Sequence, residues 1–331
     1  MTFSVIIPVY NCAPWLRECL GSVVASCQLL VASRQLLVAG ERGEGVEVIC
    51  VDDGSTDGSA EILEEFKVSE VSKFLRFKVI RQENRGEGAA RNRGLEAATG
   101  DWICFLDADD LYAPEMLTEA ARLIRENPDS DIVCVRAAVF NDGDDPRKAV
   151  LSKAGPLTGV FSTGVYRRSK FGDVRFKDYL VGADRVYAAS CVYRANRIVE
   201  GKAVGYLYRQ RATSISHVAM TPRKALDSFL HVAEMLRIAA AVGRSLDSAS
   251  RRQLVAQVLE EGASNWRMLP RTDRRAVESR WRKCVAELRK EGLLTPWGNF
   301  VAAVLRLLPF GATVSILCVL PHRLKKAGLH R

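Results

Sequence analysis

The first 130 residues alternate between strand-like and helix-like sequence, and this alternation constrains the fold more than any other feature. Each strand pattern is a short, mostly apolar run, the first of them rich in β-branched residues, and a helical segment follows it. The strands are expected at 3–9, 46–51, 74–80 and 102–106, and the helices between them at 14–26, 58–67 and 83–100. Because crossover helices join parallel strands with right-handed connections, the pattern predicts a mostly parallel, doubly wound α/β sheet.

Beyond the fourth strand the pattern changes twice. A helix at about 114–126 and a strand at 131–140 continue the alternation. A mixed segment then runs to about residue 217, with short strands and one helix that starts near Asp184. From Thr221 onward the periodicity is almost entirely helical. The expected helices are 222–242, 247–267, 271–291 and 297–326.

Charge is distributed unevenly along the chain of 331 residues. Residues 1–130 carry 13 Lys/Arg and 22 Asp/Glu, a net charge of −9, whereas residues 131–331 carry 35 and 17, a net charge of +18. We expect an α/β domain over 1–218, followed by a basic helical region over 219–331. A positive excess of this size needs a partner or a surface of opposite sign.

The most apolar stretch of the basic region is 297–320, which is interrupted by Arg306, Pro309 and Gly311. No uninterrupted run reaches the roughly 20 residues of a membrane-spanning helix. Because basic residues follow at 322–326, the stretch is interpreted either as an interfacial helix on an anionic membrane or as a packed helix. Nucleic acid is disfavoured as a partner, since no recognised nucleic-acid-binding motif accompanies these charges.

Nine cysteines are scattered along the chain, and none forms a C-x-x-C pair. Cys50, Cys104 and Cys134 lie inside apolar strand patterns, which is typical of free thiols used as small core residues. This usage indicates a reducing compartment. The segment Met1–Ser4 lacks the basic start and apolar core of a signal peptide. We therefore expect a cytoplasmic protein, with peripheral attachment to the inner face of the cell membrane as an option.

Two of the expected strands end in acidic residues. The second strand runs into Asp52-Asp53, and the fourth runs into Asp107-x-Asp109-Asp110. Open α/β sheets bind ligands at the carboxyl ends of their strands, and we expect these two strands to be neighbours. One carboxylate can accept hydrogen bonds from a nucleobase or ribose while another holds Mg²⁺ or Mn²⁺ on a diphosphate. The alternative is a solvated acidic turn that caps the next helix.

Other site patterns are incomplete in this sequence. Gly86-x-Gly88-x-x-Arg91 lacks the third glycine of a dinucleotide fingerprint and follows the third strand instead of the first. No G-x-x-x-x-G-K-[ST], G-x-S-x-G or H-E-x-x-H pattern occurs, which disfavours phosphate-loop NTPase, serine hydrolase and zinc hydrolase chemistry. What remains is a nucleotide-diphosphate site without a glycine-rich loop. Arg85, Arg91 and Arg93 can add fork-shaped donors to it.

Four short blocks in the first 140 residues carry a specific resemblance. They are Ser4–Asn11, Val51–Asp57, Asn84–Gly94 and Phe105–Asp110. In this order and spacing they resemble the signature blocks of family 2 glycosyltransferases, which are inverting enzymes with the GT-A fold. A weaker similarity continues at Phe176–Asp184 and Tyr206–Ser216. The resemblance implies a nucleotide-sugar half at about 1–140 and an acceptor half at about 141–218.

The resemblance also implies roles for individual residues. Pro8 and Tyr10 line the base pocket, and Asp53 contacts a uracil-type base or the ribose. Asp107 lies on the ribose side and is a second candidate metal ligand beside Asp109, which binds Mn²⁺ or Mg²⁺ on the diphosphate. An inverting transfer needs a carboxylate that deprotonates the acceptor hydroxyl and a metal that stabilises the leaving nucleotide.

The remaining candidates complete this set, and each has a structural alternative. Asp184 is the implied general base, or only a first-turn helix residue. Arg85, Arg91 and Arg209 are candidate ligands of the nucleotide sugar, with an ion pair to Asp or Glu as the alternative for Arg209. His217 is a candidate metal ligand or a surface histidine. Asp52 is expected to bond the following turn more often than to bind a ligand.

The implied function is a metal-dependent inverting glycosyltransferase. It would move a sugar from a nucleotide diphosphate, with a UDP-sugar favoured, to a glycan or lipid-linked acceptor in cell-surface polysaccharide synthesis. Ala183 stands where the family pattern usually has Glu, so one alternative is a nucleotide-sugar-binding protein without transferase activity. A second alternative is a membrane- or partner-docking module formed by the helical region. The donor sugar, the acceptor and the oligomeric state cannot be read from the sequence.

Overall fold

The computed structural model describes residues 1–33, 45–68, 75–152, 161–212, 219–242, 255 and 265–295. The chain divides into two compact units, and each of them uses two segments. One unit comprises Met1–Asp178 and Arg194–Ser214, and the other comprises Tyr179–Tyr193 and Ile215–Arg331. The second unit resumes at Ile215, close to the boundary expected near residue 218, and it also includes Tyr179–Tyr193, which the sequence analysis assigned to the α/β domain.

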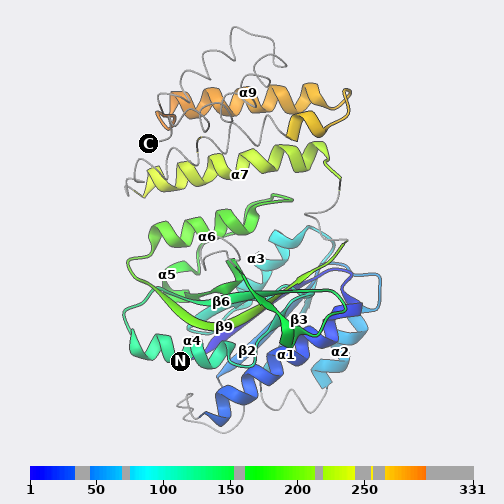
Figure 1. The fold of residues 1–331 in the computed structure, drawn as a ribbon, viewed down its shortest axis with the longest axis vertical. Coiled ribbons are helices and arrows are strands. Elements are labelled where there is room, and N and C mark those ends of the chain that lie inside the picture. Colours follow the sequence, from blue (N-terminus) through cyan, green and yellow to red (C-terminus); the bar gives the residue numbers. More distant parts are fainter. Residues whose placement is uncertain are drawn as a thin grey trace. The chain divides into compact units, whose positions relative to one another are not determined.

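The first unit contains a mixed sheet in the order β3-β2-β1-β4-β8-β6-β9-β5, with β7 on β6 (Figure 1). Its strands are β1 (Phe3–Val9), β2 (Val46–Asp52), β3 (Arg76–Arg81), β4 (Trp102–Phe105), β5 (Leu111–Tyr112), β6 (Ile132–Asn141), β7 (Val150–Leu151), β8 (Gly164–Arg167) and β9 (Ile198–Gln210). The four strands β3-β2-β1-β4 are parallel, as predicted. In the mixed segment the expected short strands are present as β7 and β8, whereas β9, with 13 residues, is longer than the sequence pattern indicated.

Helices cover both faces of the parallel strands. They are α1 (Ala13–Ala32), α2 (Ser59–Val68), α3 (Glu87–Ala97) and α4 (Met116–Glu126), with the short α5 (Arg168–Phe171) and the 3₁₀ turns η2 (Pro146–Lys148) and η3 (Phe161–Thr163). Val5 and Ile7 of β1 join α1, α2 and α4 in one core. Ile6 points to the other face, where a Cβ on Gly94 of α3 would lie 2.4 Å from its Cγ2. The close approach at Gly94 fixes α3 against the centre of the sheet.

Helix α1 is long and apolar enough to cross a membrane by length and composition. Its buried side chains, such as Leu16, Leu20 and Val23, belong to the core of the first unit. A buried core helix passes the same test of length and composition. The stretch 297–320, for which membrane contact was predicted, lies outside the described residues.

The turn that leads into β4 is anchored by Glu47 of β2, whose side chain is almost completely buried. Its carboxylate accepts hydrogen bonds from the Ser4 hydroxyl at 2.5 Å and from the backbone N–H groups of Thr99 (2.6 Å) and Gly100 (3.0 Å). Burial opposes ionisation, but these hydrogen bonds outweigh it and lower the pKa of Glu47 below its ordinary value of 4.5. Glu47 therefore helps to place the strand that delivers the acidic cluster.

Substituting Glu47→Gln is expected to lower the free energy of unfolding at pH 7 by about 1–3 kcal/mol, because a charged acceptor of buried donors is lost. A lowered pKa in the folded state means that this stability is present above pH 4.5 and is lost as the pH falls through the lowered value. Urea unfolding followed by circular dichroism at several pH values measures both effects. A difference between the two proteins that stays constant from pH 7 to pH 3 would contradict this role of Glu47.

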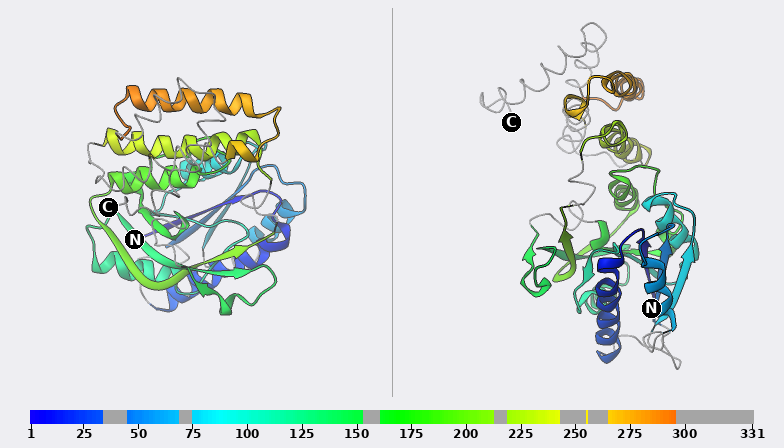
Figure 2. Two further views of the ribbon diagram at one scale, coloured as in Figure 1. Left: turned by 45° about the horizontal axis from the view of Figure 1, so that its top comes forward. Right: turned by 90° about the vertical axis from the view of Figure 1, so that its right-hand side faces the viewer.

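The second unit is helical in its described part. It contains α6 (Ala183–Arg194), α7 (Pro222–Ala241) and α9 (Arg274–Lys290), which form one layer in Figures 1 and 2. Phe229 and Val232 of α7 pack with Trp281 and Leu288 of α9 in a separate core. The helices predicted at 222–242 and 271–291 are thus confirmed. The one predicted at 297–326 and most of the one at 247–267 lie outside the described residues.

Candidate active site

Tyr10, Asp53 and Asp107 follow the carboxyl ends of β1, β2 and β4, respectively. The other predicted donor-site residues lie in β1 (Pro8), just before α3 (Arg85), in α3 (Arg91) and in β9 (Arg209). One expectation was wrong: β2 and β4 are not neighbours, because β1 lies between them and pairs with both. The first strand of a doubly wound sheet takes a central position, and the chain then builds outward on either side of it. The segment that contains Pro8 and Tyr10 therefore leaves the sheet between the two acidic strand ends. Pro8 is buried, whereas Tyr10 is 48% exposed.

Asp52 and Asp53 are both buried, and each carboxylate holds a loop. Asp52 accepts a hydrogen bond from the Ser55 N–H at 2.9 Å, which is the turn-forming role expected for it. Asp53 accepts three hydrogen bonds, from the Gln82 side-chain amide (2.7 Å) and from the backbone N–H groups of Arg85 (2.9 Å) and Gly86 (2.8 Å). A carboxylate has about four acceptor positions. Asp53 therefore shapes the loop before α3, and its contact with a base stays a prediction.

Asp107 is paired with Arg91, whose guanidinium is buried on α3. Arg91 Nη2 lies 2.7 Å from Asp107 Oδ1 and also bonds Glu87. The guanidinium carbon lies 4.8 Å from the centre of the Phe161 ring and 5.2 Å from that of Phe176. Arg91 was predicted to bind the nucleotide sugar. Its side chain is 3% exposed, so its evident role is to hold Asp107, and direct contact with the ligand stays a prediction.

Asp110 ties the end of β4 to β9. Its carboxylate accepts hydrogen bonds from the Tyr206 hydroxyl at 2.6 Å and from the backbone N–H of Arg209 at 2.7 Å. Burial raises the pKa of Asp110 well above its ordinary value, and the charges of Asp109 and Asp107 raise it further. Asp110 is thus a supporting residue of the cluster.

Asp109 forms an ion pair with Arg211, with 2.5 Å between Oδ2 and Nη2. The guanidinium of Arg211 stacks over the Trp15 ring at 4.3 Å from its centre. Burial raises the pKa of Asp109, the Asp107 charge adds to that effect, and Arg211 opposes it. Crowding of negative charge at a partly accessible carboxylate is the electrostatic condition that a cation relieves.

Arg209 is buried behind the acidic cluster. Its Nε donates to the Asp109 carbonyl oxygen at 2.7 Å, and its two Nη atoms reach Asp142 at 3.2 Å and Glu18 at 2.5 Å. The ion pairs anticipated as the alternative for this residue are therefore formed. The contact of Arg209 with a diphosphate stays a prediction.

The donor atoms at this edge fit a divalent cation. Mg²⁺ and Mn²⁺ prefer oxygen ligands, and Mg²⁺ commonly takes one or two carboxylates together with phosphate oxygens and water. Asp107 and Asp109 offer two partly exposed carboxylates. In the described part of the chain, no three His, Cys, Asp or Glu side chains are arranged as a metal site. His217, the candidate ligand from the C-terminal side, lies outside the described residues.

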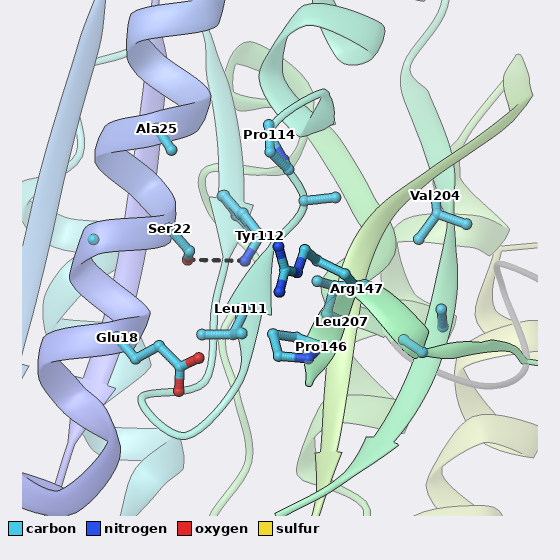
Figure 3. A pocket seen from close by; sticks show the side chains of 14 residues that line it. Glu18, Ser22, Ala25, Leu111, Tyr112, Pro114, Pro146, Arg147, Val204 and Leu207 are labelled. Carbon is cyan, nitrogen blue, oxygen red and sulfur yellow. Dashed lines mark hydrogen bonds between the residues drawn. The ribbon is translucent and has the colours of Figure 1, made fainter. Parts of the chain in front are cut away.

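A cavity of about 610 Å³ lies beside this site, between α1 and the strands β5, β6 and β9 (Figure 3). Ala25, Leu111 and Leu207 give it a mostly apolar lining. On the α1 side of the cavity, the Ser22 hydroxyl accepts a hydrogen bond from the Tyr112 N–H at 3.0 Å. None of the predicted site residues that the structure describes lines the cavity.

The predicted general base belongs to the other unit. Asp184 is the second residue of α6 and is half-buried, next to the buried Ala183. An acidic residue in the first turn is favourable to the helix in its own right, because it faces the positive end of the helix dipole. The catalytic role of Asp184 therefore stays a prediction.

Comparison with known proteins decides the family. The family model described as glycosyl transferase family 2 matches residues 4–186, more than half of the chain. The chain belongs to glycosyl transferase family 2. This family 2 member is 30% identical over 232 residues to the putative glycosyltransferase EpsH of Bacillus subtilis, covering 64% of this chain and 62% of EpsH. It is 28% identical to the poly(ribitol-phosphate) beta-N-acetylglucosaminyltransferase TarS of Staphylococcus aureus, covering 78% of this chain and 44% of TarS.

Solved structures of glycosyltransferases share the fold of this family 2 member. The crystal structure of S. aureus TarS 1-349 matches 99% of this chain and 92% of that chain, with 20% identity and a TM-score of 0.65. Its complex with UDP-GlcNAc matches with a TM-score of 0.56 and 22% identity. The Pyrobaculum calidifontis mannosyltransferase PcManGT, in complex with GDP-Man and Mn²⁺, matches with a TM-score of 0.52 and 18% identity. These similarities confirm the GT-A fold.

Several residues around the acidic cluster were not predicted. They are Trp15, Glu18, Asp142, Tyr206 and Arg211. Each is distant in sequence from the carboxylate or guanidinium that it contacts. Tyr206 and Arg211 lie in the block Tyr206–Ser216, and this weaker family similarity is the signal that the sequence offers for them.

Proposed function

We propose that this chain is a metal-dependent inverting glycosyltransferase that uses a UDP-sugar donor and a glycan or lipid-linked acceptor in cell-surface polysaccharide synthesis. The observation that carries the proposal is the meeting of the loop after β1 with the acidic ends of β2 and β4 at one edge of the sheet. Membership of glycosyl transferase family 2 supports it. The chain spans 62% of EpsH and 44% of TarS, so activity and substrates are inferred for this chain.

In this proposal the first unit binds the donor. The loops that carry Tyr10 and Asp53 hold the nucleoside, and Asp107 is fixed toward the ribose by Arg91. Asp109, which pairs with Arg211 in this structure, would together with Asp107 hold a Mn²⁺ or Mg²⁺ ion on the diphosphate. The ion, when bound, neutralises charge that develops on the departing nucleotide. UDP-GlcNAc is the first donor to try, because a complex of TarS with it shares this fold.

Asp184 performs the proton transfer. Its carboxylate takes the proton of the acceptor hydroxyl while that oxygen attacks the anomeric carbon on the face opposite the nucleotide. The bond between the anomeric carbon and the diphosphate oxygen breaks in the same displacement, so the configuration inverts. UDP leaves with the electron pair of that bond.

Donor and metal binding are expected to be linked. UDP-GlcNAc with Mn²⁺ should raise the thermal midpoint of unfolding by more than either ligand alone, because ligands that bind only the folded state stabilise it by mass action. EDTA should remove the extra shift and stop the release of UDP in the presence of a mixed acceptor panel. Unchanged UDP release in excess EDTA would overturn the metal dependence, and no shift with any UDP-sugar would overturn the donor class.

One observation favours a second candidate. Ala183 occupies the position where the family pattern has Glu, and its side chain is buried. A nucleotide-sugar-binding protein without transferase activity would show the same linked shift with Mn²⁺ but no UDP release with any acceptor, including water.

A further inference from the structure

Helix α7 contacts the segment just before the candidate base. The two elements belong to the same unit, and α6 and α7 lie side by side in Figures 1 and 2. Gly182 has φ of +85°, and a Cβ built on it would lie 2.4 Å from Cγ and 2.5 Å from Nδ1 of His231. Because both the close approach and the positive φ require glycine, the backbone at residue 182 is pressed directly against the imidazole ring.

His231 is held in one tautomer. Its Nδ1 lies 2.8 Å from the Asp227 carbonyl oxygen, one helical turn earlier, so Nδ1–H is the donor. Nε2 is then the acceptor and faces Arg185 Nη1 at 3.2 Å. Burial lowers the pKa of His231, and this favours the neutral ring that the two contacts require. His231 therefore touches the chain on both sides of Asp184, at Gly182 and at Arg185.

Asp227 provides a third contact. Its carboxylate, 4% exposed, accepts the backbone N–H of Leu180 at 2.7 Å and pairs with Arg223 Nε at 2.9 Å. The Gly182 carbonyl oxygen in turn accepts the N–H of Val186 at 3.0 Å and begins α6. The start of α6 is thus determined by two buried side chains of α7.

We propose that His231 and Asp227 are positioning residues for Asp184, so that the helical unit takes part in glycosyl transfer by holding the general base in place. The three contacts bracket Asp184 at Leu180, Gly182 and Arg185, and none of them uses the carboxylate itself. The carboxylate stays available to an acceptor hydroxyl while its backbone is immobilised. Misplacing a catalytic group by about 1 Å can reduce a rate about 100-fold, which is why such fixation matters.

The inference rests on the proposed function, since it assigns Asp184 as the base. The test uses the full chain with UDP-GlcNAc, Mn²⁺ and water as the acceptor. It compares His231→Leu and Asp227→Ala with the conservative variants His231→Gln and Asp227→Asn. The glutamine keeps an acceptor for the Arg185 guanidinium, and the asparagine keeps one for the Leu180 N–H. Ser228→Ala is the matched control, because Ser228 lies on the same turn of α7 and bonds Ala225 and Asn265 instead.

Two readouts are needed, namely amide hydrogen exchange over residues 179–186 and the rate of UDP release. In His231→Leu and Asp227→Ala, exchange is expected to quicken about tenfold or more and UDP release to fall about 10- to 100-fold, with the Kd for UDP-GlcNAc unchanged. The conservative variants should recover most of both losses. If a leucine or alanine variant fails to fold, the conservative variants are expected to show the same changes to a smaller degree.

Three results would overturn the inference: unchanged exchange over 179–186, faster exchange with full UDP release, or equal losses in Ser228→Ala. Asp184→Asn separates this inference from the proposed function. Full UDP release in Asp184→Asn would remove the base assignment and with it the catalytic part of the inference, while the exchange data still report whether α7 holds the segment.

Discussion

Replacing Asp184 with Asn is expected to lower the rate of UDP release about 10²- to 10⁴-fold, the usual contribution of a general base. Asn has nearly the same shape as Asp but cannot accept the proton of the attacking hydroxyl. Since the first unit contains all the predicted donor ligands, the Kd for UDP-GlcNAc should be unchanged. Steady-state release of UDP with Mn²⁺, alongside calorimetric titration of the donor, measures the two quantities.

Asp129→Asn is the matched control for this loss of one negative charge. Asp129 is exposed and pairs with Arg197 on the surface, so its substitution should leave UDP release within about twofold of wild type. Turnover of Asp184→Asn equal to that of this control would exclude Asp184 as the base.

Replacing Arg91 with Met is expected to lower the free energy of unfolding by about 3 kcal/mol, because removing one partner of a buried ion pair leaves the other uncompensated. Asp107, which is 26% exposed, would keep part of its hydration, so the loss should lie near the lower end of the usual range. Contacts of the guanidinium with Phe161 and Phe176 would also be lost. Urea unfolding at pH 7 measures the change.

Arg93→Met provides the comparison on the same helix. Arg93 is 57% exposed and pairs with Glu96 at the surface, and such pairs contribute at most about 1 kcal/mol. A loss of stability no larger in Arg91→Met than in Arg93→Met would show that the buried pair does not support the site.

The parallel core of the fold could be predicted because three of its four strands, β1, β2 and β4, are mostly apolar runs. Strands such as β1 and β2 are buried along their whole length, and that pattern survives in the sequence without knowledge of neighbours. The order of the strands could not be predicted in the same way. The alternation of strands and helices shows which elements follow one another along the chain. It does not show that β1 lies between β2 and β4 in the sheet.

The acidic residues of the site were predicted, but their partners were not. Asp52 and Asp53 stand out because two charges end an apolar strand, whereas Gln82 becomes their neighbour only through the fold. Arg211 pairs with Asp109 across about 100 residues of sequence. Local periodicity carries no information about such contacts, since they depend on the pairing of β3 with β2 and of β9 with β5.

Because each unit uses two separate segments of the chain, recombination with a related gene cannot replace one whole unit through a single crossover. Residues 179–193 belong with the helical unit, and the chain then returns to complete the sheet with β9 before it leaves for good. Suppose that a relative's helical region replaced this one through a single recombination point near residue 218. The relative's equivalent of α7 would then pack against the α6 start of this chain, and its residues at the positions of His231 and Asp227 would not be matched to that segment. We therefore expect a folded chimera to need two coordinated crossovers, so that the helical region is inherited together with residues 179–193.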